Sequence, residues 1–101
     1  MNPDDCQNMS DIRYEIDAID HQVIQLLGQR KRYVHAASKF KTSASKVKAP
    51  ERLKTMLAQR RVWAEAADLD PSVIEKMYQD LVAYFIETEM KEWRSSPTNK
   101  G

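Results

Sequence analysis

Residues Ser10–Ala37, SDIRYEIDAIDHQVIQLLGQRKRYVHAA, decide the fold of this 101-residue chain. Apolar residues recur in this stretch at alternating spacings of three and four, which is the pattern of one face of an α-helix. They are Ile12, Ile16, Ile19, Val23, Leu26, Val34 and Ala37. The apolar pattern is interrupted at Arg30. Gly28 lies inside the stretch and lowers the stability of a helix by about 1 kcal/mol relative to alanine. We nevertheless predict one long first helix that begins near Ser10 and carries an apolar stripe along its length.

Two further helices follow, and prolines mark where they begin. Pro50 and Pro71 each suit the first position of a helix, where the missing N–H costs nothing, and Asp70 is a suitable N-cap. We predict a second helix from about Pro50 to Ala67 and a third from Pro71 to about Arg94. Their apolar residues are Leu53, Met56, Leu57 and Trp63 in the second, and Ile74, Met77, Leu81, Phe85 and Trp93 in the third.

The predicted fold class is therefore all-α, with three helices in a single domain over residues 1–101 and a core of about 10–94. The first helix predicts a partner chain, because about 30 residues span roughly 45 Å, whereas a compact monomer of this size is only about 34 Å across. Two shorter helices cannot cover an apolar stripe of that length. We expect a homodimer in which the long first helices are interleaved.

The composition of the chain excludes several classes of protein. A formal net charge of +1 and a pI near 7.8 lack the basic excess of a nucleic-acid binder. No apolar run approaches the roughly 20 residues of a membrane span. The first residues are polar and acidic, unlike a signal peptide. Cys6 is the single cysteine, which agrees with a reducing compartment. We therefore expect a cytoplasmic protein. His21 and His35 lie about 21 Å apart on the first helix, so we expect no metal and no cofactor.

Three cations and one acid fall where apolar residues are expected. Arg30 and Lys41 are 11 residues apart, which in a continuous helix places them on one face about 16 Å apart along the axis. Arg13 is about 25 Å from Arg30 on another side of that helix, so it can reach the same ligand only from the other protomer of a dimer. Glu89 lies on or beside the apolar stripe of the third helix, where burial raises the pKa of a carboxyl group unless a cation pairs with it.

These charges also have a plainer interpretation. Lysine and arginine often lay their stems along apolar surface while the charged head stays in water, and a purely structural ion pair between Glu89 and Lys41 fits the spacing as well. The paired cations elsewhere, Lys31–Arg32, Lys46–Lys48 and Arg60–Arg61, are expected to be solvated. Because the chain has no basic excess, several cations beside an acid favour a site for a small dianion, whose carboxylates guanidinium groups bind bidentately.

The segments DIRYEIDAIDHQVIQLLGQR, KFK and PERL, in this order, resemble the all-helical chorismate mutase family. The resemblance covers about Pro3 to Arg94 and implies an interleaved dimer of three-helix chains with shared active sites. Within the family, PDDC, YVHAASKFK, APERLKTML, RRVWAE and MKEWR resemble the isochorismate pyruvate lyase branch. Those lyases convert isochorismate to salicylate and pyruvate by a pericyclic elimination, in salicylate and siderophore biosynthesis.

The resemblance also implies roles for individual residues. Arg30 and Arg13 of the partner subunit would hold the substrate carboxylates, and Lys41 would contact the ether oxygen while its loop closes as a lid. Glu89 corresponds to a polar residue that hydrogen-bonds near the breaking bond, which makes Lys41, Arg30 and Glu89 the candidate catalytic residues. The candidate substrate-binding residues are Arg13, Arg30, Lys41, Thr42, Glu89 and three apolar wall residues, Val34, Met56 and Ile86.

Two positions depart from the family's patterns. In the mutases the arginine of the second-helix motif is followed by a glutamate that holds the ring hydroxyl of chorismate, but here Arg52 is followed by Leu53. This favours the lyase, since isochorismate carries its hydroxyl elsewhere on the ring. Glu89 stands where lyase-like sequences usually carry glutamine, and only a protonated glutamate can donate a hydrogen bond. Either burial keeps Glu89 protonated, or activity falls as pH rises. We expect the fall, because Lys41 and Arg30 at the same site would favour the ionised form.

Other functions remain open. A chorismate mutase is the alternative enzyme, and the shared clamp would allow weak mutase activity beside the lyase. A non-catalytic helical dimer that binds a small dicarboxylate or a partner protein would bind product without turnover. A helical DNA-binding dimer ranks third, because the net charge is close to zero.

Overall fold

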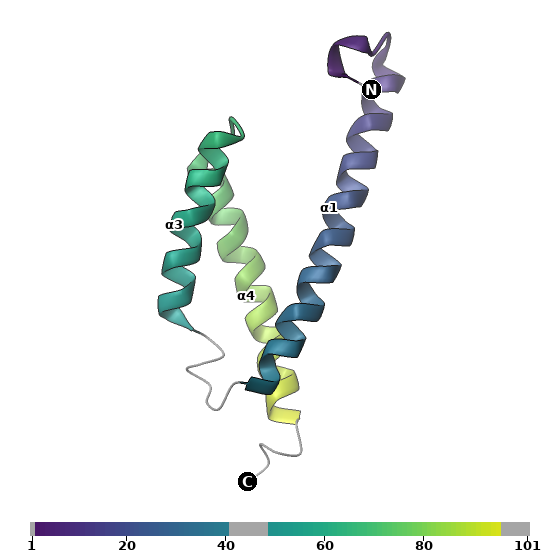
Figure 1. Ribbon diagram of the computed structural model, residues 1–101. Coiled ribbons are helices and arrows are strands. Elements are labelled where there is room, and N and C mark those ends of the chain that lie inside the picture. The colour runs from purple at the N-terminus through teal and green to yellow at the C-terminus, as the bar shows by residue number, and fades with distance from the viewer. Residues whose placement is uncertain (1, 41–48, 96–101) are drawn as a thin grey trace. The chain divides into compact units, whose positions relative to one another are not determined.

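The computed structural model describes residues 2–40 and 49–95, and every regular element in these two ranges is helical (Figure 1). In chain order they are η1 (Pro3–Asp5), α1 (Met9–Ala37), η2 (Ser38–Phe40), α3 (Pro50–Ala66) and α4 (Pro71–Ser95), where η marks a 3-10 helix. The predicted all-α fold with a long first helix is confirmed. The chain divides into two compact units, Met1–Tyr33 and Val34–Gly101. A single domain over residues 1–101 stays a prediction.

The start of α1 is fixed by two short polar side chains. Asn8 accepts a hydrogen bond from the backbone N–H of Asp11 at 2.9 Å, and Asp11 accepts one from the N–H of Gln7 at 3.0 Å. This arrangement resembles a capping box, except that Asp11 binds the N–H of the residue before the N-cap, and the Asn8 side chain satisfies a donor that the first turn of a helix leaves unpaired. Asn8 followed by Asp11 is the local signal for this start, one residue before the predicted Ser10.

The end of α1 coincides with the last residue of the predicted apolar stripe. The α-helix ends at Ala37, and the tighter helix η2 covers Ser38–Phe40. The hydroxyl of Ser38 donates a hydrogen bond to the carbonyl of His35 at 2.6 Å, so a side chain binds one of the carbonyls left free at a helix end. The expectation that one α-helix continues from Arg30 to Lys41 therefore fails at Ser38, and the face on which Lys41 lies stays a prediction, because Lys41 is outside the described residues.

Helices α3 and α4 begin at the two prolines, as predicted. The N–H of Ser72 donates to the side chain of Asp70 at 2.9 Å, which confirms Asp70 as the N-cap of α4. The residue before α3 is Ala49, with φ 40° and ψ 62°. This left-handed conformation costs a residue with a Cβ about 1–2 kcal/mol.

Helices α3 and α4 pack against each other as a hairpin (Figure 1). Within residues 2–40 and 49–95, every buried residue lies on one of these two helices: Met56, Leu57, Ala64, Phe85, Glu89 and Met90. Met77, predicted for the apolar face, is 59% exposed, because the side of α4 it occupies is not the side that meets α3.

Two arginines predicted to be solvated help to join α3 and α4. Arg61 pairs with Glu75 at 2.8 Å between Nη1 and Oε2. The guanidinium of Arg60 lies 4.7 Å from the ring centroid of Trp63 and 5.5 Å from that of Tyr78, which is within the range of cation–π attraction. The expectation that both arginines are simply solvated is wrong, because Glu75 and Tyr78 on α4 meet them in the folded hairpin, while Trp63 lies one turn after Arg60 on α3 itself.

None of the 29 residues of α1, all of them in the described part of the chain, is buried. From Ile12 to Leu26 the apolar stripe is open, with exposed fractions from 39% for Ile12 to 59% for Leu26, whereas Val34 and Ala37 at its end are half-buried. Isolated apolar residues on a surface are ordinary, whereas a continuous stripe of them is typical of an interface.

Candidate active site

Glu89 is the candidate catalytic residue that the structure describes most completely. It lies on α4, one turn after the buried Phe85, and is 4% exposed. The expectation that this carboxyl group stands at a buried position is confirmed. Burial raises the pKa of a carboxyl group, and a neighbouring cation lowers it. Acids in such surroundings are typical of functional sites.

Three apolar candidates lie in the same compact unit as Glu89. Met56 is buried on α3, Ile86 is half-buried on α4, and Val34 is half-buried in the last turn of α1. The packing of α3 on α4 thus keeps Met56, Ile86 and Glu89 on one hairpin. An apolar surrounding of this kind strengthens any charge interaction made within it, because the local dielectric constant is low.

Arg13 and Arg30 belong to the other unit, where both lie on α1. Arg13 is exposed and Arg30 is half-buried. Because α1 is continuous from Met9 to Ala37, the separation of 17 positions between the two arginines corresponds to about 25 Å along the axis. One copy of α1 therefore holds the two guanidinium groups too far apart to grip the same small ligand.

Lys41 and Thr42, with the loop expected to act as a lid, lie outside the residues that the structure describes. The roles of all the candidate residues in binding or catalysis stay predictions. Within residues 2–40 and 49–95, no group of three histidine, cysteine, aspartate or glutamate side chains is arranged to hold a metal ion. In the same ranges, no helix has the length and apolar character needed to cross a membrane.

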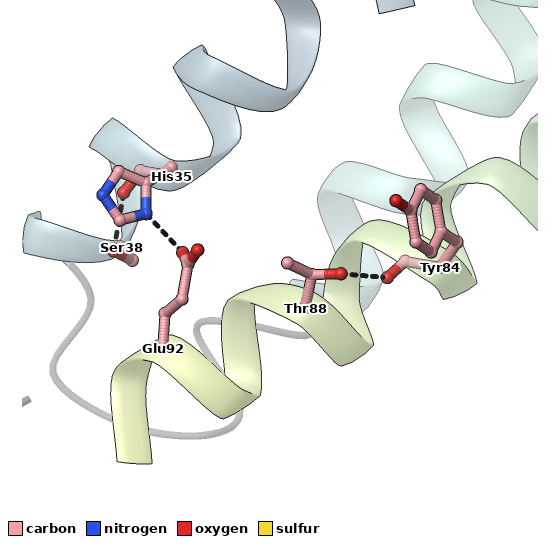
Figure 2. A network of polar contacts seen from close by, with 5 residues as sticks. All are labelled: His35, Ser38, Tyr84, Thr88 and Glu92. Atoms are coloured by element: carbon pink, nitrogen blue, oxygen red, sulfur yellow. Dashed lines mark hydrogen bonds and ion pairs between the residues drawn. The ribbon is translucent and has the colours of Figure 1, made fainter. Parts of the chain in front are cut away.

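The structure adds a polar pair that the sequence pattern did not reveal. Nδ1 of His35, near the end of α1, bonds to Oε2 of Glu92 on α4 (Figure 2). The two residues are 57 positions apart in the chain. No local signal predicts such a contact, because helix periodicity relates only residues three or four positions apart.

Known proteins resemble this chain over most of its length. Residues 12–90 match the family model described as chorismate mutase type II. The isochorismate pyruvate lyase of Pseudomonas aeruginosa is 42% identical over 94 residues, which cover 93% of each chain. The T-protein of Haemophilus influenzae is 38% identical over 68 residues, which cover 66% of this chain and 18% of that protein. The match over residues 12–90 includes parts of all three α-helices, and the chain belongs to the chorismate mutase type II family.

Proposed function

We propose that this chain is an isochorismate pyruvate lyase that converts isochorismate to salicylate and pyruvate. The observation that carries the proposal is the 42% identity to a protein of that name over 93% of both chains. Leu53 supports it, because the glutamate that would hold the hydroxyl of chorismate is missing after Arg52. The buried carboxyl group of Glu89 and the apolar Met56 on the adjacent helix supply the mixed polar and apolar lining that such a substrate needs.

The reaction needs no nucleophile. A hydrogen passes from a ring carbon to the methylene carbon of the enolpyruvyl group while the bond between ring carbon and ether oxygen breaks, which leaves an aromatic ring and pyruvate. A protein accelerates such a step by holding a reactive conformer and by stabilising negative charge on the departing oxygen. In our proposal Arg13 and Arg30 hold the two carboxylates, Lys41 stabilises the oxygen, and protonated Glu89 donates a hydrogen bond beside it.

We also propose that the enzyme is a homodimer with shared active sites. The exposed stripe of α1 supports this assembly, because a second copy would cover it. The separation of about 25 Å between Arg13 and Arg30 supports it too, since a partner helix can bring a second Arg13 to a site that holds Arg30. The expected cytoplasmic location remains a prediction.

The proposal is tested by adding isochorismate to the purified protein and following the fluorescence of salicylate, with lactate dehydrogenase and NADH reporting pyruvate in the same sample. Both products are expected in equal amounts. Binding of isochorismate without formation of either product would instead identify a non-catalytic dimer that binds a dicarboxylate, and would refute the enzyme.

A chorismate mutase is the second candidate, which the family match favours. The two activities are separated by assaying chorismate and isochorismate side by side. We expect the lyase to dominate, and restoring the acid with Leu53→Glu is expected to shift the ratio toward the mutase. A wild-type protein that is faster on chorismate would reverse the assignment.

Lys41→Ala tests the role of the third cation. We expect kcat to fall about 10² or more, as when an electrostatic donor to a developing oxyanion is removed. Lys39→Ala is the matched control, because Lys39 is exposed on η2 and has no role in the proposal. Full activity of Lys41→Ala would sink this assignment, and equal losses in both variants would show a general charge effect instead.

A further inference from the structure

The polar contact between His35 and Glu92 connects two elements that carry candidate wall and catalytic residues. His35 lies in the last turn of α1, and Glu92 lies near the end of α4, and both belong to the unit Val34–Gly101. Nδ1 of the imidazole contacts Oε2 of the carboxylate (Figure 2). The side chains are 58% and 35% exposed, so the pair stands at the surface with the carboxylate on its more buried side.

His35 is held at its backbone as well as at its side chain. The hydroxyl of Ser38, the first residue of η2, donates to the carbonyl of His35 at 2.6 Å. Figure 2 shows the side chain directed to Glu92 while Ser38 lies below it. The segment 34–40, which includes all of η2, is thus connected to α4 through one residue, and η2 itself lies against α4.

The neighbours of the two paired residues give this connection its importance. Val34 directly precedes His35, and Glu89 lies three residues before Glu92 on the same side of α4. The pair therefore joins the turn that carries a wall residue to the turn that carries the buried acid. Ion pairs such as Lys76–Asp80 and Lys91–Glu87 have a different effect, because each lies within α4 and connects no second element.

We propose that His35 and Glu92 are positioning residues, which hold Val34 at the end of α1 in the place where it can contact a substrate beside Glu89. This inference rests on the proposed function for its effect on rate. An exposed ion pair adds little to stability, whereas a displacement of about 1 Å at a wall of the site can lower the rate about 10². The pair should therefore influence turnover far more than unfolding.

The test removes each partner from the full-length protein. His35→Ala and Glu92→Ala are each expected to lower kcat/KM about tenfold or more, by misplacing a wall of the site. Because the two residues act through one contact, the double variant should lose no more than about the larger single loss. His35→Lys should recover most of the rate, since a lysine supplies a cation that can still reach Glu92.

Glu75→Ala is the matched control. It breaks Arg61–Glu75, which also joins two elements and has similar side-chain exposures of 42% and 33%, but carries no candidate site residue beside it. We expect Glu75→Ala to lower the unfolding temperature about as much as Glu92→Ala while kcat/KM stays within about twofold of the wild type. Equal losses of kcat/KM in Glu75→Ala and Glu92→Ala would overturn the proposal, as would additive losses in the double variant.

Amide hydrogen exchange separates this inference from the proposed function. Exchange over residues 34–40 is expected to speed up in Glu92→Ala and not in Glu75→Ala, whatever reaction the protein catalyses. Unchanged exchange in Glu92→Ala would refute the positioning role. A wild-type protein without lyase activity would refute the proposed function, and the exchange result would still decide whether the pair holds this segment in place.

Discussion

Helix α1 and the hairpin of α3 and α4 use apolar residues at the same spacing, yet they meet water very differently. Ile16 and Ile19 on α1 are 50% and 56% exposed, whereas Phe85 and Met90 on α4 are 4% and 8% exposed. The hairpin buries its apolar residues within one chain, because a short connection brings two helices face to face. The stripe on α1 is instead suited to burial by a second copy, so the two regions should respond differently to mutation and to protein concentration.

The largest effect should come from adding charge to the stripe on α1. Each unpaired charge buried in an interface costs about 3–5 kcal/mol, so Ile16→Asp combined with Ile19→Asp should raise the dissociation constant of the dimer by at least about 10². Activity should disappear with the dimer, since each site would lose its second arginine. Analytical ultracentrifugation reports the mass, and the isochorismate assay reports the activity.

The control for this variant is Tyr14→Asp, because Tyr14 is 73% exposed and lies on the opposite side of α1 from Ile16. It should leave the protein dimeric. If the doubly substituted protein were a monomer with full activity, the proposal that two subunits share each active site would be wrong.

Shortening a buried side chain of the hairpin should lower the stability of the protein whether or not the dimer forms. Phe85→Ala is expected to lower the free energy of unfolding by about 3–5 kcal/mol, through lost burial and the cavity left behind. Urea unfolding measures the loss. Tyr84→Ala, on the next residue with 54% exposure, should cost only about 1 kcal/mol. Similar losses in the two variants would mean that α3 and α4 do not form the stable core.

Glu89, on the hairpin, should make the turnover rate of the enzyme depend on pH. A protonated carboxyl group can donate a hydrogen bond and is present below its pKa, so kcat should fall about tenfold per pH unit once the pH exceeds that value. Burial of the carboxyl group shifts the pH at which the fall begins upward, a cation beside it would shift that pH downward, and neither changes the direction of the fall. Glu89→Gln keeps a donor at every pH and should flatten the profile. Coincident profiles for the two proteins would show that Glu89 does not act as a donor.

The smallest effect is expected within α1 at Gly28. A Cβ built there meets no atom within 4 Å, so Gly28→Ala should stabilise the helix by about 1 kcal/mol through propensity alone. Thermal unfolding at fixed protein concentration measures the gain. A loss of stability would show that a second copy packs closely against this glycine, and would extend the interface beyond the stripe.

The parts of the fold that sequence predicted correctly are those set by local chemistry. Pro50, Pro71 and Asp70 define the starts of α3 and α4, because ring geometry and capping act within a few residues. The end of α1 at Ala37 has no such local signal, since no glycine or proline marks it. Ser38 binding the carbonyl of His35, together with a contact to α4, accompanies that end, and tertiary contacts of this kind leave no periodic signal.

The features of the candidate site also divide into those that local sequence predicts and those that depend on tertiary contacts. The buried position of Glu89 followed from its spacing after Phe85 on an amphipathic helix. The contact of His35 with Glu92 and the stacking of Arg60 near Tyr78 did not follow, because each depends on which turn of one helix faces which turn of another. The roles of Arg13, Arg30 and Lys41 came from family resemblance and await experiment.

The open stripe of α1 has a consequence for how the protein is made. A ribosome completes this helix before it begins the 58 residues from Ser38 to Ser95, which take about 3–12 s at ordinary rates of translation. During that interval a nascent chain carries an amphipathic helix with nothing from its own hairpin to cover it. Such a segment is a natural binding site for chaperones, or for a helix emerging from a neighbouring ribosome on the same messenger RNA.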